Sequence, residues 1–183
     1  MITIHLDQLI DKEHRLEFEE KPEAFPVLTD MIHSNACVFL NPIKTRLRAY
    51  RIGDIVEVEG YFETEVRLAC SRCLTEFETS IASHFTLTYM QENPDRQNKL
   101  PDEDVELKPD EIGLIPFSGD EINLMEGIQE QVVIAFPLKP LCRDKCKGLC
   151  PKCGAILNQS DCGCDTSAFN TSFSVLKNLK IDR

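Results

Sequence analysis

Hydrophobic and polar residues alternate through the middle of the chain, between residues 52 and 90. One face of this two-residue period carries Val56, Val58, Phe62, Val66, Leu68 and Cys70, and glutamates occupy most of the positions between them. The alternation resumes after Cys73 with Phe77, Ile81, Phe85, Leu87 and Tyr89. This pattern is typical of antiparallel strands with one buried face. It predicts two strands that flank Cys70–Cys73, so that these cysteines occupy the tip of a hairpin.

The periodicity changes to helical spacing in the segment 122–136. Its apolar residues recur at intervals of three or four, which predicts a helix with one face toward the core. Asn123 and Glu126 resemble a capping box at its start, and Pro137 ends it. Residues 1–50 show weaker patterns and predict short strands and loops, with a strand through Cys37–Phe39. A further short strand is expected in 112–118.

These elements predict an α+β fold in which a mainly antiparallel β-sheet packs against a helix. We expect a β-rich domain over residues 1–138 and a cysteine-rich zinc module over 139–183, attached to the hairpin tip. The module is expected to end in a short helix near 172–180. The segment 91–111 holds eight acids against three bases and predicts a solvated loop. A docking site for a basic partner is the alternative interpretation of this loop.

Cysteine is the most unusual feature of the composition, with nine residues in 183. Cys37 stands alone in an apolar run and is expected to be a buried thiol. The other eight form four close pairs, and all eight are candidate metal ligands: Cys70, Cys73, Cys142, Cys146, Cys150, Cys153, Cys162 and Cys164. In a reducing compartment such pairs indicate metal binding better than disulfides. Structural zinc is held by four such ligands in a tetrahedron, so one or two zinc ions are expected, with two favoured.

Two pairing schemes divide the eight thiols into two sites. In the favoured scheme the last four cysteines form one compact site, which closes a short loop at little entropic cost. Cys142 and Cys146 then join the hairpin pair. In the other scheme both CxxC pairs share a zinc, as in a zinc ribbon. A single zinc with spare thiols is a third possibility.

No motif predicts catalysis. A thioredoxin-type dithiol needs a strand-to-helix context, whereas Cys70 and Cys73 lie between two expected strands. Catalytic zinc usually has histidine or carboxylate ligands and an open position, but the four histidines lie outside the cysteine motifs. Glycine-rich phosphate loops and the GxSxG and HExxH motifs do not occur. We therefore expect a protein that is not an enzyme and has no small-molecule substrate.

The charge distribution bears on the kind of partner. The formal net charge is −11, which argues against general nucleic-acid coating, because that relies on many Lys and Arg residues. A local exception lies in 139–153, where Lys139, Arg143, Lys145, Lys147 and Lys152 face one acid, Asp144. These cations either offset the zinc-bound thiolates or form a contact surface for RNA phosphates or another partner. The chain shows no signal peptide or membrane-spanning run, so a cytoplasmic location is expected.

Several motifs in their order resemble the YceD family of large ribosomal RNA subunit accumulation proteins. The resemblance rests on the CxRC pair at Cys70–Cys73, the block PLCxxxCKGLCPKCGxxLN from Pro140 to Asn158, the following CGC pair and the LKNLK tail. It implies a role in synthesis, processing or stability of large-subunit ribosomal RNA, and it implies that the eight paired cysteines are the family cysteines. Expected partners are a pre-ribosomal large-subunit particle, its RNA or a ribosomal protein. The alternative is a zinc-stabilised adaptor between proteins that affects ribosomal RNA only indirectly.

Overall fold

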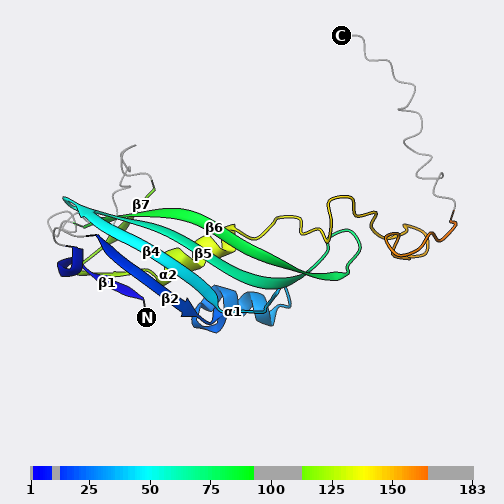
Figure 1. The fold of residues 1–183 in the computed structure, drawn as a ribbon, viewed down its shortest axis with the longest axis horizontal. Helices are drawn as coiled ribbons and strands as arrows, with labels where there is room; N and C mark the ends of the chain where they lie inside the picture. The colour runs from blue at the N-terminus through cyan, green and yellow to red at the C-terminus, as the bar shows by residue number, and fades with distance from the viewer. Residues whose placement is uncertain (1, 10–12, 93–112, 165–183) are drawn as a thin grey trace, which may run out of the picture. The chain divides into compact units, whose positions relative to one another are not determined.

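The computed structural model describes residues 2–9, 13–92 and 113–164 of the chain (Figure 1). These residues form two compact units. The first unit comprises the described residues up to Leu68 and from Glu78 to Leu138, and the second comprises Ala69–Phe77 and the described residues from Lys139 onward. The long hairpin of the sheet therefore contributes its tip to the second unit.

The first unit is built around a six-stranded sheet with the strand order β2-β4-β5-β6-β7, and β3 pairs with β5 beside this path. The strands are β2 (His14–Glu20), β3 (Val38–Phe39), β4 (Ile43–Ile52), β5 (Ile55–Ala69), β6 (Glu76–Gln91) and β7 (Leu114–Phe117). The β2–β4, β3–β5 and β4–β5 pairs are antiparallel, whereas β7 runs parallel to β6. The predicted mainly antiparallel sheet is confirmed, with one parallel edge.

One face of this sheet is buried, as the alternation predicts. Val56, Val58, Phe62 and Val66 of β5 are fully buried, and the buried face of β6 includes Ile81 and Phe85. Two α-helices complete the unit, α1 (Pro26–His33) and α2 (Met125–Ile134), with 3-10 helices η1 (Leu6–Leu9) and η2 (Pro22–Ala24). A separate two-stranded sheet pairs β1 (Thr3–His5) with β8 (Glu121–Asn123).

Helix α2 packs against β6 at a position where it has no side chain. A Cβ atom at Gly127 would lie 2.7 Å from Cδ1 of Leu87 and 2.8 Å from the hydroxyl oxygen of Tyr89. Glycine therefore permits a close approach of helix and strand that a larger residue would prevent. Helix α1 is joined to α2 by a hydrogen bond of 2.8 Å, which the backbone N–H of Val27 donates to the buried side chain of Gln129.

The structure corrects several of the sequence-based expectations. The helix expected over 122–136 begins only at Met125, because the residues before it form β8 and pair with β1. The capping box is wrong: Leu124 is the N-cap, and the side chain of Asn123 accepts a hydrogen bond from the backbone N–H of Met125. Helix α1 was not predicted, since its eight residues contain a single buried side chain, Leu28.

Strand β4 is much longer than the short strands expected in residues 1–50. Its buried positions include Thr45 and Ala49, which weaken the hydrophobic alternation. The short strand expected in 112–118 is confirmed as β7. Most of the acidic segment 91–111 and the helix expected near 172–180 lie outside the described residues. Across the described ranges, no helix has the length and apolar character that crossing a membrane requires.

Candidate metal centre

The two CxxC pairs are held by the same backbone turn. In the hairpin tip, the N–H of Cys70 donates to the carbonyl of Thr75 at 3.0 Å, and the N–H of Leu74 donates back to the carbonyl of Cys70 at 2.9 Å. The second pair repeats both bonds. The N–H of Cys150 donates to the carbonyl of Ala155 at 2.8 Å, and the N–H of Gly154 donates back to the carbonyl of Cys150 at 2.9 Å. Each turn therefore directs two thiols to one side.

The residue after the second cysteine of each turn has a left-handed backbone. Gly154 has φ +73°. In the hairpin tip the same position is Leu74, with φ +60°. A non-glycine residue in this region is disfavoured because its Cβ approaches the following carbonyl. The hairpin turn thus presents its two thiols together although Leu74 does not favour the left-handed backbone that this turn requires.

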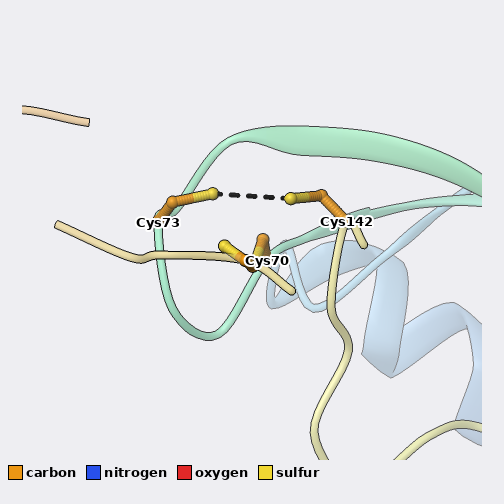
Figure 2. Close-up of side chains that lie close together, drawn as sticks. Cys70, Cys73 and Cys142 are labelled. Atoms are coloured by element: carbon orange, nitrogen blue, oxygen red, sulfur yellow. Dashed lines mark hydrogen bonds between the residues drawn. The ribbon is translucent and has the colours of Figure 1, made fainter. Parts of the chain in front are cut away.

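The first cluster joins the hairpin tip to the segment after Lys139. The ligand atoms of Cys70, Cys73, Cys142 and Cys146 all lie within 4.8 Å of one another. The Sγ atoms of Cys73 and Cys142 are 3.7 Å apart, as are those of Cys70 and Cys146. Figure 2 shows the sulfur atoms of Cys73 and Cys142 directed toward each other, with Cys70 beside them.

The first cluster is largely closed to solvent. Cys70, Cys73 and Cys146 are buried and form a small core with partly buried apolar neighbours: Phe77, Leu141, Leu149 and Ile156. The backbone of the hairpin tip is held to the facing segment by the N–H and the hydroxyl of Ser71, which both donate to the carbonyl of Pro140 at 2.8 and 3.0 Å. The side chain of Arg72 donates to the carbonyl of Cys146 at 3.0 Å.

The second cluster is local in sequence and more exposed. The ligand atoms of Cys150, Cys153, Cys162 and Cys164 again lie within 4.8 Å of one another. Cys150 is buried, Cys162 and Cys164 are partly buried, and Cys153 is exposed. The grouping of thiols in both clusters is the one that the favoured pairing scheme predicts, and it differs from the zinc-ribbon scheme.

The sulfur spacing of the first cluster fits a tetrahedral metal ion with four sulfur ligands. Zinc–sulfur bonds of about 2.3 Å place the corners of such a tetrahedron about 3.8 Å apart, and the two sulfur pairs given above are 3.7 Å apart. A disulfide would require about 2.05 Å. Four thiolates without a nitrogen or oxygen ligand are typical of structural zinc.

Hydrogen bonds and burial separate the acidities of the thiols in the first cluster. The pKa of Cys70 is lowered to about 6, mainly by a hydrogen bond from the backbone N–H of Cys142. The Thr75 side chain is the main cause that lowers the pKa of Cys73. Burial, reinforced by the neighbouring thiols, raises the pKa of Cys142 to about 12. The hairpin thiols Cys70 and Cys73 are thus more acidic than Cys142.

The second cluster shows the same asymmetry. The pKa of Cys150 is lowered to about 6, mostly by a hydrogen bond from the backbone N–H of Cys153. The neighbouring side chain of Cys153 is the largest of those that raise the pKa of Cys164 to about 12. In both clusters the first cysteine of the CxxC turn is the most acidic of the shifted thiols, because backbone N–H groups point at its sulfur. In the first cluster the main one comes from Cys142 on the facing segment, and in the second it comes from Cys153 of the turn itself.

The five basic residues singled out in the sequence lie at the surface, in the segment 139–153 that carries cysteines of both clusters. Lys139, Arg143, Lys145, Lys147 and Lys152 are all exposed. Within the described part of the chain none of them forms an ion pair. Arg143 has an internal role, because its side chain donates to the backbone carbonyl of Asn158 at 3.3 Å.

The contact of Asn158 with the site has no counterpart among the residues predicted from the sequence. Its side-chain amide lies 3.0 Å from Sγ of Cys146 and 3.9 Å from Sγ of Cys142. Asn158 ends the motif block that begins at Pro140, but its place between the cysteines of the other cluster does not indicate a contact with Cys142 and Cys146. The buried thiol expected at Cys37 is confirmed, and burial raises its pKa.

Comparison with known proteins places this site in a family. A family model described as "Large ribosomal RNA subunit accumulation protein YceD" matches residues 58–180, which include both clusters. A chloroplastic protein of Arabidopsis thaliana, named as a YCED homolog 1 large ribosomal RNA subunit accumulation protein, is 28% identical over 156 residues. That alignment covers 76% of this chain and 49% of the plant protein.

Bacterial and further plant relatives are similarly distant. An uncharacterized protein of Mycobacterium tuberculosis is 30% identical over 145 residues, covering 75% of this chain and 66% of that protein. The Zea mays chloroplastic YCED homolog 1 is 27% identical over 128 residues, covering 60% of this chain and 44% of the maize protein. The chain therefore spans about half the length of the plant relatives. No solved structure matches it.

Proposed function

This chain belongs to the YceD family of large ribosomal RNA subunit accumulation proteins, and we propose that it is a zinc-binding factor without enzymatic activity. In this proposal it supports the synthesis, processing or stability of large-subunit ribosomal RNA during ribosome assembly. The observation that carries the proposal is the pair of four-cysteine clusters within a match to a family that is named for ribosomal RNA accumulation.

The proposed role of zinc is structural. The four thiols of each cluster would hold one ion, and each ion would supply a tetrahedral cross-link between loops. The first would join the hairpin tip to Cys142 and Cys146, and the second would close the loop 150–164. Four sulfur ligands leave no position for water, which argues against a catalytic metal. Grouping the hairpin pair with two further thiols also favours a metal site over a redox dithiol.

The proposed contact surface is the set of exposed cations around the clusters. Lys145, Lys147 and Lys152 are exposed and unpaired within the described residues, so their charges are available to phosphates. The proposed partners are a pre-ribosomal large-subunit particle, its RNA or a ribosomal protein, and the proposed compartment is the cytoplasm. No membrane contact or small-molecule substrate forms part of the proposal.

A second candidate is an adaptor that binds another protein and affects ribosomal RNA indirectly. The net charge of −11 favours it, because an acidic surface repels phosphates. The open face of the sheet in the first unit is also acid-rich, and its cations are engaged with glutamates, as in the 2.8 Å ion pair of Arg48 with Glu59. Such a surface suits a basic protein better than RNA.

Sedimentation of the tagged protein from lysate tests the two candidates. We expect it to migrate with large-subunit precursors on a sucrose gradient at low salt, and to return to the top as salt rises, because phosphate contacts weaken steeply with salt. Reversing Lys145, Lys147 and Lys152 to Glu should abolish migration without loss of zinc.

The matched control reverses three exposed cations of the first unit, Arg15, Lys44 and Arg46, whose side chains are 78%, 54% and 65% exposed. This control should still migrate with the precursors. If the control variant loses migration and the variant of the zinc unit keeps it, the open sheet face is the contact surface. If wild-type protein stays at the top at both salt concentrations, the adaptor is the better candidate.

A further inference from the structure

Asn158 belongs to the loop of the second cluster but contacts the first. In sequence it stands between Cys153 and Cys162. Its Nδ2 atom donates to Sγ of Cys146 at 3.0 Å and approaches Sγ of Cys142 at 3.9 Å. One side chain therefore links the loop that carries one set of ligands to the sulfur atoms of the other set.

The orientation of this amide is determined by its other partner. The backbone N–H of Lys147 donates to Oδ1 of Asn158 at 2.9 Å. Because a backbone N–H requires an acceptor, the oxygen of the amide must face Lys147 and the NH₂ group must face the sulfurs. Asn158 thus holds the Cys142–Cys146 loop through its oxygen and the thiols through its nitrogen.

The backbone around Asn158 is held to the first cluster by further contacts. Leu149 and Ile156 form an isolated antiparallel bridge, and both pack against the buried thiols of the first cluster. The N–H of Leu157 donates to the carbonyl of Gly148 at 3.0 Å. Arg143 adds the bond of 3.3 Å to the carbonyl of Asn158. The position of the amide therefore depends on the fold of the loop 150–164, which carries all four thiols of the second cluster.

We infer that Asn158 is a positioning residue that couples the two metal sites. The hydrogen bond from Nδ2 of Asn158 fixes the position of the Cys146 sulfur, and groups that orient metal ligands in this way strengthen metal binding. Zinc at the second cluster would order the loop and hold the amide in place, and binding at the first cluster would benefit. Coupling between sites is reciprocal in free energy, so zinc at the first cluster favours zinc at the second by the same factor. This inference rests on the zinc-binding part of the proposed function.

The decisive variant is Asn158→Asp in the full-length chain. It keeps the oxygen that accepts from Lys147 but removes the NH₂ donor and places a carboxylate beside the sulfurs. Removing a residue that orients metal ligands typically costs about 10- to 100-fold in metal affinity, and we expect a loss of that size at the first cluster. Asn158→Ala should show at least the same loss. Gln159→Ala is the matched control, because Gln159 is the exposed neighbouring amide and should leave affinity unchanged.

The measurement is competition for zinc with a chromophoric chelator, combined with mass mapping of alkylated cysteines at each chelator concentration. Mapping reports separately on the four thiols of each cluster. The coupling is tested with Cys153→Ser/Cys162→Ser, which removes two ligands of the second site. This double variant should weaken the first cluster, and adding Asn158→Asp to it should cause little further loss, because both changes remove the same contact.

Each outcome decides the inference. Coupling through Asn158 is supported if the combined variant loses less zinc affinity at the first cluster than the sum of the losses in Asn158→Asp and in the double variant. Fully additive losses, or an Asn158→Asp protein with wild-type affinity at the first cluster, overturn it while leaving zinc binding intact. A wild-type protein that binds no zinc overturns both the inference and the zinc part of the proposed function.

Discussion

At the scale of single residues, Tyr89 illustrates the cost of a buried hydroxyl. Tyr89 is 3% exposed, and within the described residues its hydroxyl has no hydrogen-bond partner. Burial, followed by the nearby charges of Glu130 and Glu126, raises its pKa to about 12 from an ordinary value of about 10. The folded protein therefore holds the phenolic proton more tightly than the unfolded chain does. The stability that this provides is complete below about pH 10 and is lost as pH rises toward about 12.

We predict that Tyr89→Phe will not destabilise the protein at pH 7, since an unpaired buried hydroxyl contributes little. Between about pH 10 and 12 the variant should lose less stability than wild type. Urea unfolding followed by far-UV circular dichroism at pH 7 and at intervals above pH 9 measures both effects. Tyr50→Phe is the control at pH 7, because the hydroxyl of Tyr50 does have a partner, Glu57. The same alkaline loss in Tyr89→Phe and wild type would contradict the prediction.

At the scale of the elements, Gly60 shows how β5 and β6 fit together. Gly60 lies on the buried face of β5, between Val58 and Phe62, where the alternation predicts an apolar side chain. A Cβ atom here would overlap the ring of Phe85 from β6. The ring thus occupies the space above the glycine and packs beside Phe62, with ring centroids 6.3 Å apart.

We predict that Gly60→Ala will lower the free energy of unfolding by about 1–3 kcal/mol, because overpacking displaces a buried ring that cannot easily rotate away. Replacing a strand glycine with alanine usually increases stability, so the expected loss is opposite to the usual effect. The free energies of unfolding of the variant and of the wild type are measured by urea denaturation. Glu59→Ala, one residue along on the open face, removes only the surface ion pair with Arg48 and should cost less than about 1 kcal/mol. A Gly60→Ala protein as stable as wild type would contradict the prediction.

The elements differ in how well their sequence patterns predicted them. Strands β5 and β6 are long, and their apolar positions are mostly Val, Leu, Ile and Phe, so a two-residue period is visible along most of their length. Strand β4 has the same buried face, but Thr45 and Ala49 interrupt its pattern. The start of α2 depended on the pairing of β8 with β1, two segments more than 100 residues apart, which no local pattern encodes.

At the scale of the whole molecule, the two units use different sources of stability. The first unit buries a large apolar face of its sheet, whereas the second has a small core in which cysteines are the fully buried members. We therefore expect the second unit to depend on bound metal for its folding. The three tyrosines of the chain, Tyr50, Tyr61 and Tyr89, all lie in the first unit, so their near-UV signal reports on that unit alone.

We predict that Cys150→Ser will unfold much of the second unit while leaving the sheet intact. The tyrosine signal in near-UV circular dichroism should keep its wild-type size, and cobalt titration should show loss of at least the second site. Cys37→Ser is a matched control, because Cys37 is a buried thiol of the first unit outside both clusters, and it should leave the cobalt spectrum unchanged. Equal loss of the tyrosine and cobalt signals in Cys150→Ser would show that the units do not fold separately.

The sequence by itself determined the β5–β6 hairpin, the helical segment near α2 and the eight paired cysteines, because each depends on spacing over a few residues. It left open which pairs share a site. Tertiary structure decided this by bringing Cys142 and Cys146 to the hairpin tip, a closure over about 70 residues whose cost no local pattern records. It also placed Asn158 against the thiols of the other cluster. A side chain that acts on a distant loop has no signature along the chain, because its partners are neighbours only in the folded protein.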